Sequence, residues 1–257
     1  MVLQQVEPKK IYIRVPAPLI STAWIYHDEV NGLISLSSNG STWITIADKN
    51  LWATSVYNWT NDEAHCWKFY QWWNNYGFPY SWAITTSYSQ INVSTYWPWN
   101  YYSSSTFITQ SSGDWANPRN NNLWWYFTGT NVAMQWPCDS GFHIPTSTEL
   151  TNFFNTWVSL WAWSASNWTG IVTYAKIWMW GWLASNSWSI GNVGSQAYIW
   201  SSQYYGSNTI NAYWIYIAST QVAIRNNISK SNWCSIRPFK NTPTQPDETW
   251  TILYQPS

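Results

Sequence analysis

The stretch that decides the fold is residues 136–161, WPCDSGFHIPTSTELTNFFNTWVSLW, because it holds the clearest helix signal in the chain. Thr146 is a suitable N-cap, since its hydroxyl can accept a hydrogen bond from an unpaired backbone N–H. Glu149 stands three residues later, where it can reach back and complete a capping box, and Pro145 precedes the cap. Apolar side chains then recur at helical spacing: Leu150, Phe153, Phe154, Trp157, Val158 and Trp161. We therefore predict a helix with one apolar face and one face of Thr, Asn and Ser.

Most of the remaining chain is typical of short strands and turns. LISLSS at 33–38 and the alternating Ile44 and Ile46 flank Asn39-Gly40, which predicts a hairpin. Closing strands are predicted at 197–203, 211–218 and 235–240, and long loops with short strands at 74–135. Asn226 and Asn227 are assigned to the loop between the last two of these strands. Because the apolar helix face must be buried, we predict an α+β fold with one or two helices packed on sheet.

The composition limits the classes of partner. The 257 residues carry 11 basic and 11 acidic side chains, and only 9% are charged, which argues against a nucleic-acid surface. Aromatic residues make up 20% of the chain, which argues against disorder. No run reaches the roughly 18 apolar residues of a membrane span. We therefore expect neither a nucleic-acid partner nor a membrane span in this chain.

The cellular location is inferred from the N-terminal residues and from the composition of the chain. MVLQQVEPKK has no apolar run behind its lysines, so it is no signal peptide. Richness in Ser, Thr, Asn, Tyr and Trp, with few Lys and Glu, resembles secreted surface proteins. We expect an extracellular or cell-surface piece of a longer exported protein, or a truncated gene model, and a non-exported protein is the alternative. The expected organisation is a strand or linker at 1–32, a domain at 33–240 and a proline-rich linker at 241–257.

Three cysteines allow at most one internal disulfide. A Cys66–Cys138 bridge fits an exported chain, with Cys234 left over. The alternative is three buried thiols.

The tryptophan count is anomalous: 26 tryptophans stand beside 11 glycines, where an average chain of this length has about 18 glycines. Many tryptophans occupy turn-like contexts, and some bacteria read the codon UGA as glycine. We hypothesise that roughly half of the tryptophans are mistranslated glycines. The glycine candidates are Trp52, Trp67, Trp73, Trp97, Trp99, Trp136, Trp178, Trp180, Trp188 and Trp233. The candidates for genuine tryptophan are Trp72, Trp115, Trp124, Trp182 and Trp200.

Blocks in a fixed order carry a family resemblance: IADKNLWAT, KFYQWW, GFHIPTSTEL, YIWSSQ and SIRPFK. They resemble the Fibrobacter succinogenes major paralogous domain (FISUMP) family over about residues 33–240. The family patterns D-x-N-L-G and Y-Q-W-G place glycine at Trp52 and Trp73, and the family cysteine after Arg237 is Pro238 here. The helix start also resembles formylglycine-generating-enzyme-like domains. The resemblance implies a C-type-lectin-like fold, with helices on a small irregular antiparallel sheet and long loops.

No catalytic motif is present, and we expect no cofactor and no metal. His143 lies near Cys138 and Asp139, but this spacing matches no strong zinc pattern. We therefore expect His143 to be structural. The same expectation holds for Thr146, Glu149, Trp200 and Arg237.

Aromatic and amide side chains in the loops suit recognition of a glycan or a surface protein, because rings stack on sugars and amides donate and accept hydrogen bonds. The ligand-binding candidates are Tyr204, Tyr205, Asn208, Asn226 and Asn227. The resulting hypothesis is a non-catalytic binding module of a bacterial surface protein. One alternative is a structural spacer. The other is an enzyme related to the formylglycine generators, which would need a reactive thiol at Cys234.

Overall fold

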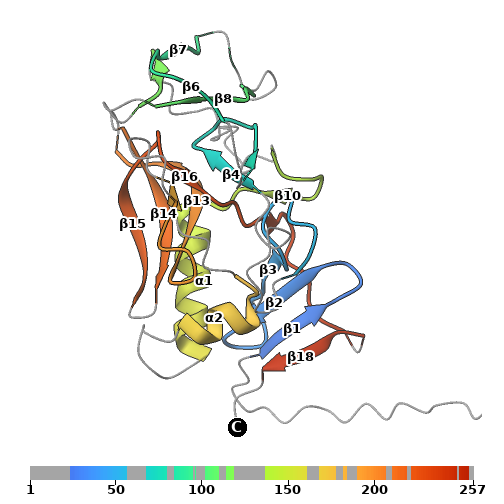
Figure 1. Ribbon diagram of the computed structural model, residues 1–257. Helices are drawn as coiled ribbons and strands as arrows, with labels where there is room; N and C mark the ends of the chain where they lie inside the picture. Colours follow the sequence, from blue (N-terminus) through green and yellow to red (C-terminus); the bar gives the residue numbers. More distant parts are fainter. Residues whose placement is uncertain are drawn as a thin grey trace, which may run out of the picture.

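The computed structural model describes residues 24–56, 68–79, 84–94, 96, 102–109, 114–118, 137–160, 168–177, 182–183, 190–206, 210–218, 221–247 and 249–254. These residues form mainly antiparallel sheets with two helices, so the predicted α+β class is confirmed (Figure 1). The helices are α1 (Ser147–Leu160) and α2 (Trp168–Tyr174). Neither helix in this described part is long and apolar enough to cross a membrane.

The six-stranded sheet contains the predicted hairpin, and its order is β10-β17-β3-β2-β1-β18. The strands are β10 (Phe142–His143), β17 (Phe239–Lys240), β3 (Ile44–Ala47), β2 (Leu33–Ser37), β1 (Trp24–Asp28) and β18 (Thr251–Tyr254). Ile34 pairs with Ile46 across the hairpin, as the alternation predicts. The buried Ser35 and Thr45 hydroxyls, which alternation would place outside, bond each other at 2.6 Å and so satisfy their polar atoms.

Strands β1 and β18 lie outside the predicted domain limits of 33–240. Strand β1 lies in the segment expected to be a strand or linker, 1–32, and β18 lies in the segment expected to be a linker, 241–257; the two strands pair with each other in the sheet. Ile25 is fully buried there and joins the core. The folded unit therefore takes in residues on both sides of 33–240, while 1–23 and 255–257 lie outside the described residues.

The three-stranded sheet has the order β13-β14-β15. Its strands are β13 (Gln196–Tyr204), β14 (Asn211–Ala218) and β15 (Gln221–Ser229). The first two were predicted, but β15 was not, and the assignment of Asn226 and Asn227 to a loop is wrong. Both asparagines fall where the β14–β15 register shifts: Ala212 faces Ile228, and Trp214 faces Arg225. This bulge interrupts the alternation on which the sequence prediction depended.

The remaining strands are short. The five-stranded sheet consists of β12 (Ile190–Gly191), β11 (Trp182–Leu183), β16 (Trp233–Cys234), β4 (Lys68–Gln71) and β5 (Phe78–Pro79). Two parallel pairs join β6 (Thr85–Ser87) to β8 (Thr106–Ile108) and β7 (Ile91–Asn92) to β9 (Ala116–Asn117). The closing strand predicted at 235–240 is wrong in extent: only Phe239–Lys240 is a strand there, because Pro238 cannot donate to a ladder.

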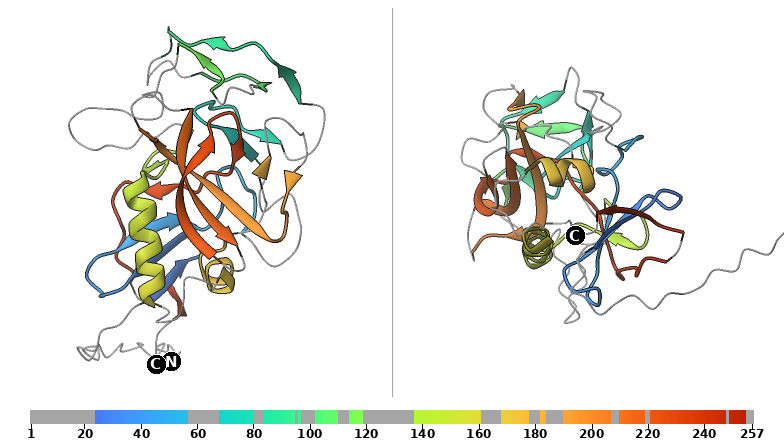
Figure 2. Two further views of the ribbon diagram at one scale, coloured as in Figure 1. Left: turned by 90° about the vertical axis from the view of Figure 1, so that its left-hand side faces the viewer. Right: turned by 90° about the horizontal axis from the view of Figure 1, so that it is seen from below.

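Helix α1 packs against all three strands of the three-stranded sheet and against β2, and Figure 2 shows it beside them. The predicted capping box is present: the Thr146 N–H donates to Glu149 Oε2 at 2.7 Å, and the Glu149 N–H donates to Thr146 Oγ1 at 3.1 Å. The buried face consists of Leu150, Phe153, Trp157 and Leu160. Each such side chain contributes about 1.5–3 kcal/mol when it leaves water, so this face fixes the helix in place.

Strand alternation divides the interior into two cores. In β13, Ile199 faces the core that contains α1, while Trp200 faces a second, aromatic core. In β4, Phe69 and Tyr70 divide in the same way. Successive side chains of a strand point to opposite faces, so β4 and β13 each contribute to both cores.

Candidate functional site

A groove of about 550 Å³ lies between α1 and the β2–β3 hairpin, and we call it the helix–hairpin groove. Its walls are mainly amides and hydroxyls, with two aromatic rings. The lining residues are Ser38, Asn39, Thr42, Trp43, Ile44, Thr45, Glu149, Asn152, Asn155, Thr156, Ser159, Phe239, Lys240 and Pro243.

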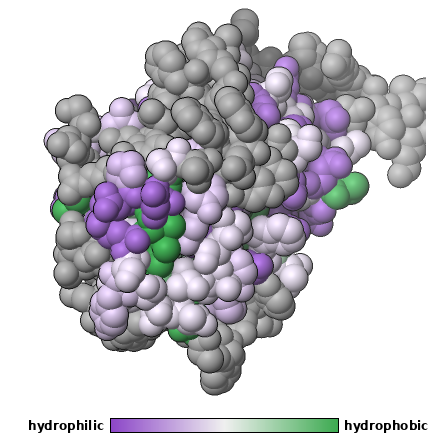
Figure 3. Space-filling model, turned by 90° about the horizontal axis from the view of Figure 1, so that it is seen from above, coloured by the Kyte–Doolittle hydropathy of each residue, from purple (hydrophilic) through white to green (hydrophobic). Residues whose placement is uncertain are grey.

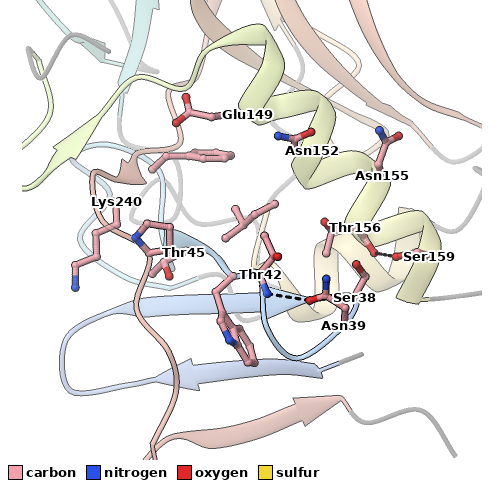
Figure 4. Close-up of a pocket in the computed structure, with 14 residues that line it drawn as sticks. Ser38, Asn39, Thr42, Thr45, Glu149, Asn152, Asn155, Thr156, Ser159 and Lys240 are labelled. Atoms are coloured by element: carbon pink, nitrogen blue, oxygen red, sulfur yellow. Dashed lines mark hydrogen bonds between the residues drawn. The ribbon is translucent and has the colours of Figure 1, made fainter. Parts of the chain in front are cut away.

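The helix wall of the groove is a polar stripe. Asn152, Asn155, Thr156 and Ser159 repeat at the spacing that places residues on one side of a helix. Figure 4 shows them along the side of α1 that faces the hairpin. Asn152 and Asn155 are exposed, and within the described residues no hydrogen bond engages either amide. Their donors and acceptors are therefore available to a ligand.

The hairpin wall is held by its own turn. Asn39 Oδ1 accepts the Ser41 N–H at 2.9 Å and the Thr42 N–H at 2.8 Å, and Figure 4 draws the bond to Thr42. The Trp43 ring meets Tyr26 edge-on at 5.8 Å, and its indole N–H has no acceptor in the described part of the chain. The wall thus presents a rigid loop and a half-buried ring.

The two charged groups of the groove are each engaged by a neighbour. The Lys240 Nζ donates to Thr244 Oγ1 at 2.7 Å. Glu149 Oε1 lies 2.9 Å from His143 Nε2, and His143 Nδ1 lies 2.8 Å from Asn241 Oδ1. Burial raises the pKa of Glu149, but hydrogen bonds and the charge of His143, with bonds from Thr146, outweigh it, so the pKa is lowered overall.

We expect acid to weaken the helix start. Because the pKa of Glu149 is lowered on folding, its contribution is present above the unfolded value of about 4.3 and is lost as pH falls through the lower folded value. Thermal melts from about pH 6 down to pH 3 should show a smaller fall of Tm for Glu149→Gln than for the unaltered protein. Glu29→Gln, at an exposed carboxylate, is the control. A fall equal to that of the unaltered protein would contradict the assignment.

Residues of the family-like blocks form a buried framework away from the groove. Arg237 Nε donates to Asn50 Oδ1 at 3.1 Å, and its other nitrogens donate to the Ala47 and Lys176 carbonyls at 2.9 and 2.7 Å. Asp48 Oδ2 lies 3.0 Å from His27 Nε2. These contacts join β3 to the segments before β17 and after α2, which is a structural role.

A second cavity of about 490 Å³ lies beside this framework. Its lining includes Glu29, Asp48, Trp52 and Asp139. Among the described residues, no group of three or more His, Cys, Asp or Glu side chains is arranged to hold a metal ion. We therefore assign no ligand to this cavity.

Four of the five ligand-binding residues predicted from the sequence, Tyr204, Tyr205, Asn226 and Asn227, lie at one end of the three-stranded sheet and do not line the helix–hairpin groove. Tyr204 faces Ala212, and Tyr205 meets Tyr213 edge-on at 5.5 Å. The register places the Asn226 and Asn227 bulge opposite Tyr213, so the structure brings these side chains to the same end. Asn208 lies outside the described residues.

The structure describes two of the three cysteines. Cys138 and Cys234 are buried free thiols, and burial raises the pKa of both well above the ordinary value. Cys66 lies outside the described residues. Cys234 therefore stays protonated at neutral pH and is unsuited to act as a nucleophile.

The sequence prediction missed the groove. The polar stripe of α1 was visible as the non-apolar face of the predicted helix, but nothing local placed Trp43 or Phe239 in the same groove. The chain matches no family model, no curated protein and no solved structure.

Proposed function

We propose that the chain is a non-catalytic module of an exported bacterial surface protein and that it binds a neutral glycan in the helix–hairpin groove. The observation that carries this proposal is the lining of the groove: exposed amides on α1 and a half-buried tryptophan on the hairpin line the same cavity. A sugar offers hydroxyls to amides and an apolar face to a ring.

The charge of the groove supports a neutral ligand. Glu149 and Lys240 stand near one end, and each is already engaged within the protein. The amides and hydroxyls along α1 add no charge. A strongly acidic or basic ligand would find little to pair with, whereas hydroxyl groups would find both donors and acceptors.

The surface supports a small ligand over a broad apolar partner. On the face seen in Figure 3, hydrophilic and neutral residues predominate among those described, and hydrophobic ones form small groups between them. A docking surface for a large apolar partner would need a wide contiguous patch.

The fold and the location are parts of the same proposal. One long helix on irregular antiparallel strands, together with the FISUMP-like blocks, supports a C-type-lectin-like architecture. The enzyme alternative needs a reactive thiol, and the burial of Cys234, which raises its pKa, supports the non-catalytic proposal over it. The spacer alternative is separated by the binding experiment.

The test is a glycan array probed with the whole chain, followed by titration of the best glycan. Asn152→Ala combined with Asn155→Ala should weaken binding about tenfold, because two hydrogen bonds of about 0.5–1.5 kcal/mol each are lost. Both positions are exposed on a helix and alanine favours helix, so folding is preserved.

The control is Tyr205→Ala combined with Asn227→Ala, which alters the site predicted from the sequence at one end of the three-stranded sheet. Loss of binding only in the variant with Asn152→Ala and Asn155→Ala would support a binding site in the groove. Loss only in the Tyr205 pair would move the site to the three-stranded sheet and overturn the groove. No binding to any glycan would favour the spacer.

A further inference from the structure

Two tryptophans occupy a backbone conformation that glycine adopts readily. Among the described non-glycine residues, positive φ occurs at Trp52 (64°), Trp73 (56°), Lys176 (54°) and Asn192 (65°). Asparagine tolerates this region, but a bulky side chain is strained there. Trp52 and Trp73 are also the positions at which the family-like blocks place glycine.

Both tryptophans stand at the third position of a β-turn. The Ala53 N–H donates to the Asn50 carbonyl at 2.9 Å, and the Asn74 N–H donates to the Gln71 carbonyl at 2.9 Å. The residues before the two tryptophans, Leu51 and Trp72, do not have positive φ. Positive φ at the third residue alone is the type II pattern, which requires glycine or asparagine at that position. Two separate turns thus share one requirement that tryptophan does not meet.

The hydrogen bonding of the indole N–H groups also distinguishes Trp73 from the tryptophans near it. The indole N–H groups of Trp72, Trp115 and Trp200 donate to the carbonyls of Ser201, Trp72 and Tyr70 at 3.0, 3.1 and 2.7 Å. A buried indole N–H is normally paired in this manner. That of Trp73 is buried and has no acceptor in the described part of the chain.

The hydrogen-bond criterion alone does not decide every position. Among the described residues the indole N–H of Trp233 also has no acceptor, but its φ is not positive. Position 233 therefore stays a prediction from the sequence. Of the other candidates, Trp67, Trp97, Trp99, Trp124, Trp136, Trp178, Trp180 and Trp188 and the side chain of Trp182 lie outside what the structure describes.

We propose that the natural polypeptide carries glycine at positions 52 and 73, encoded by UGA codons that its host reads as glycine. Each glycine then sits at the third residue of a turn without strain. The buried unpaired indole of position 73 is removed with its side chain. This proposal is independent of the glycan site, because neither residue lines the helix–hairpin groove.

The direct test is mass spectrometry of peptides from the protein made in its native host, read beside the gene. Glycine masses and UGA at 52 and 73, with tryptophan masses and UGG at 72, 115 and 200, would support the proposal. Tryptophan at 52 and 73 would overturn it.

A comparison of the stability of two variants at position 52 tests the backbone argument. Trp52 is 57% exposed, so replacing it leaves no buried cavity. Trp52→Gly should melt about 2–4 °C above Trp52→Ala, because alanine keeps the positive-φ strain and glycine relieves it. Both variants lose the contact of Lys68 with the ring, so that loss cancels. An equal or lower Tm for the glycine variant would count against the proposal.

Discussion

Arg237→Met should lower the free energy of unfolding by about 3–5 kcal/mol. The Arg237 side chain is buried, and it donates to Asn50 and to the Ala47 and Lys176 carbonyls. Methionine fills much of the same volume but removes the donor from the buried Asn50 oxygen, at about 1–3 kcal/mol, and from two part-buried carbonyls, at a smaller cost each. Urea denaturation followed by circular dichroism measures the loss.

The matched control is Arg225→Met on β15. Arg225 is half-buried and lies over the Tyr216 ring at 6.0 Å. A partly exposed cation–π contact of this kind contributes about 0.5–1 kcal/mol, so the control should lose little. Equal losses in the two variants would show that the buried framework around Arg237 contributes nothing special.

Lys230→Met should be nearly as damaging, because it leaves a buried carboxylate without its cation. The Lys230 Nζ lies 3.4 Å from Asp114 Oδ2, and the two side chains are 0% and 1% exposed. Breaking a buried pair by removing one partner costs about 3–5 kcal/mol. The expected consequence is a loss of that size in urea denaturation.

A double variant separates the pair from its surroundings. Lys230→Met combined with Asp114→Asn removes both charges, so it should be about 1–2 kcal/mol more stable than Lys230→Met alone. The position of Lys230 over the Trp72 ring, at 4.9 Å, is lost in both variants and cancels. Strictly additive losses would contradict coupling between the two charges.

How much of the fold could be predicted depended on the range of the interactions involved. Helix α1 was predicted because its cap and its apolar repeat are both local, and the hairpin because Ile34 and Leu36 alternate. Strand β15 was missed, since the bulge at Asn226 and Asn227 breaks its period. The short strand β16 pairs with β4, far away in sequence, and no local pattern marks it.

The candidate site was predictable only in part for the same reason. The composition indicated a ligand that rings and amides recognise, and the polar face of α1 was present in the sequence. What the sequence did not show is that Phe239 and Trp43 line the same groove as that face, because Phe239 is brought there by its pairing with Ile46, far away in sequence. The sequence prediction instead placed the binding site at Tyr204 and Tyr205, at the end of β13 in the three-stranded sheet.

The pairing of β1 with β18 also sets how the unit would respond to mechanical load. Ile25 faces Tyr254 while His27 faces Thr251, so the outer ends of the two strands are neighbours. Tension applied through the flanking chain would pull this pair apart from that end, and its hydrogen bonds would break one after another, as in a zipper. A module built this way would yield first at the edge of the six-stranded sheet and leave the helix–hairpin groove intact at low force.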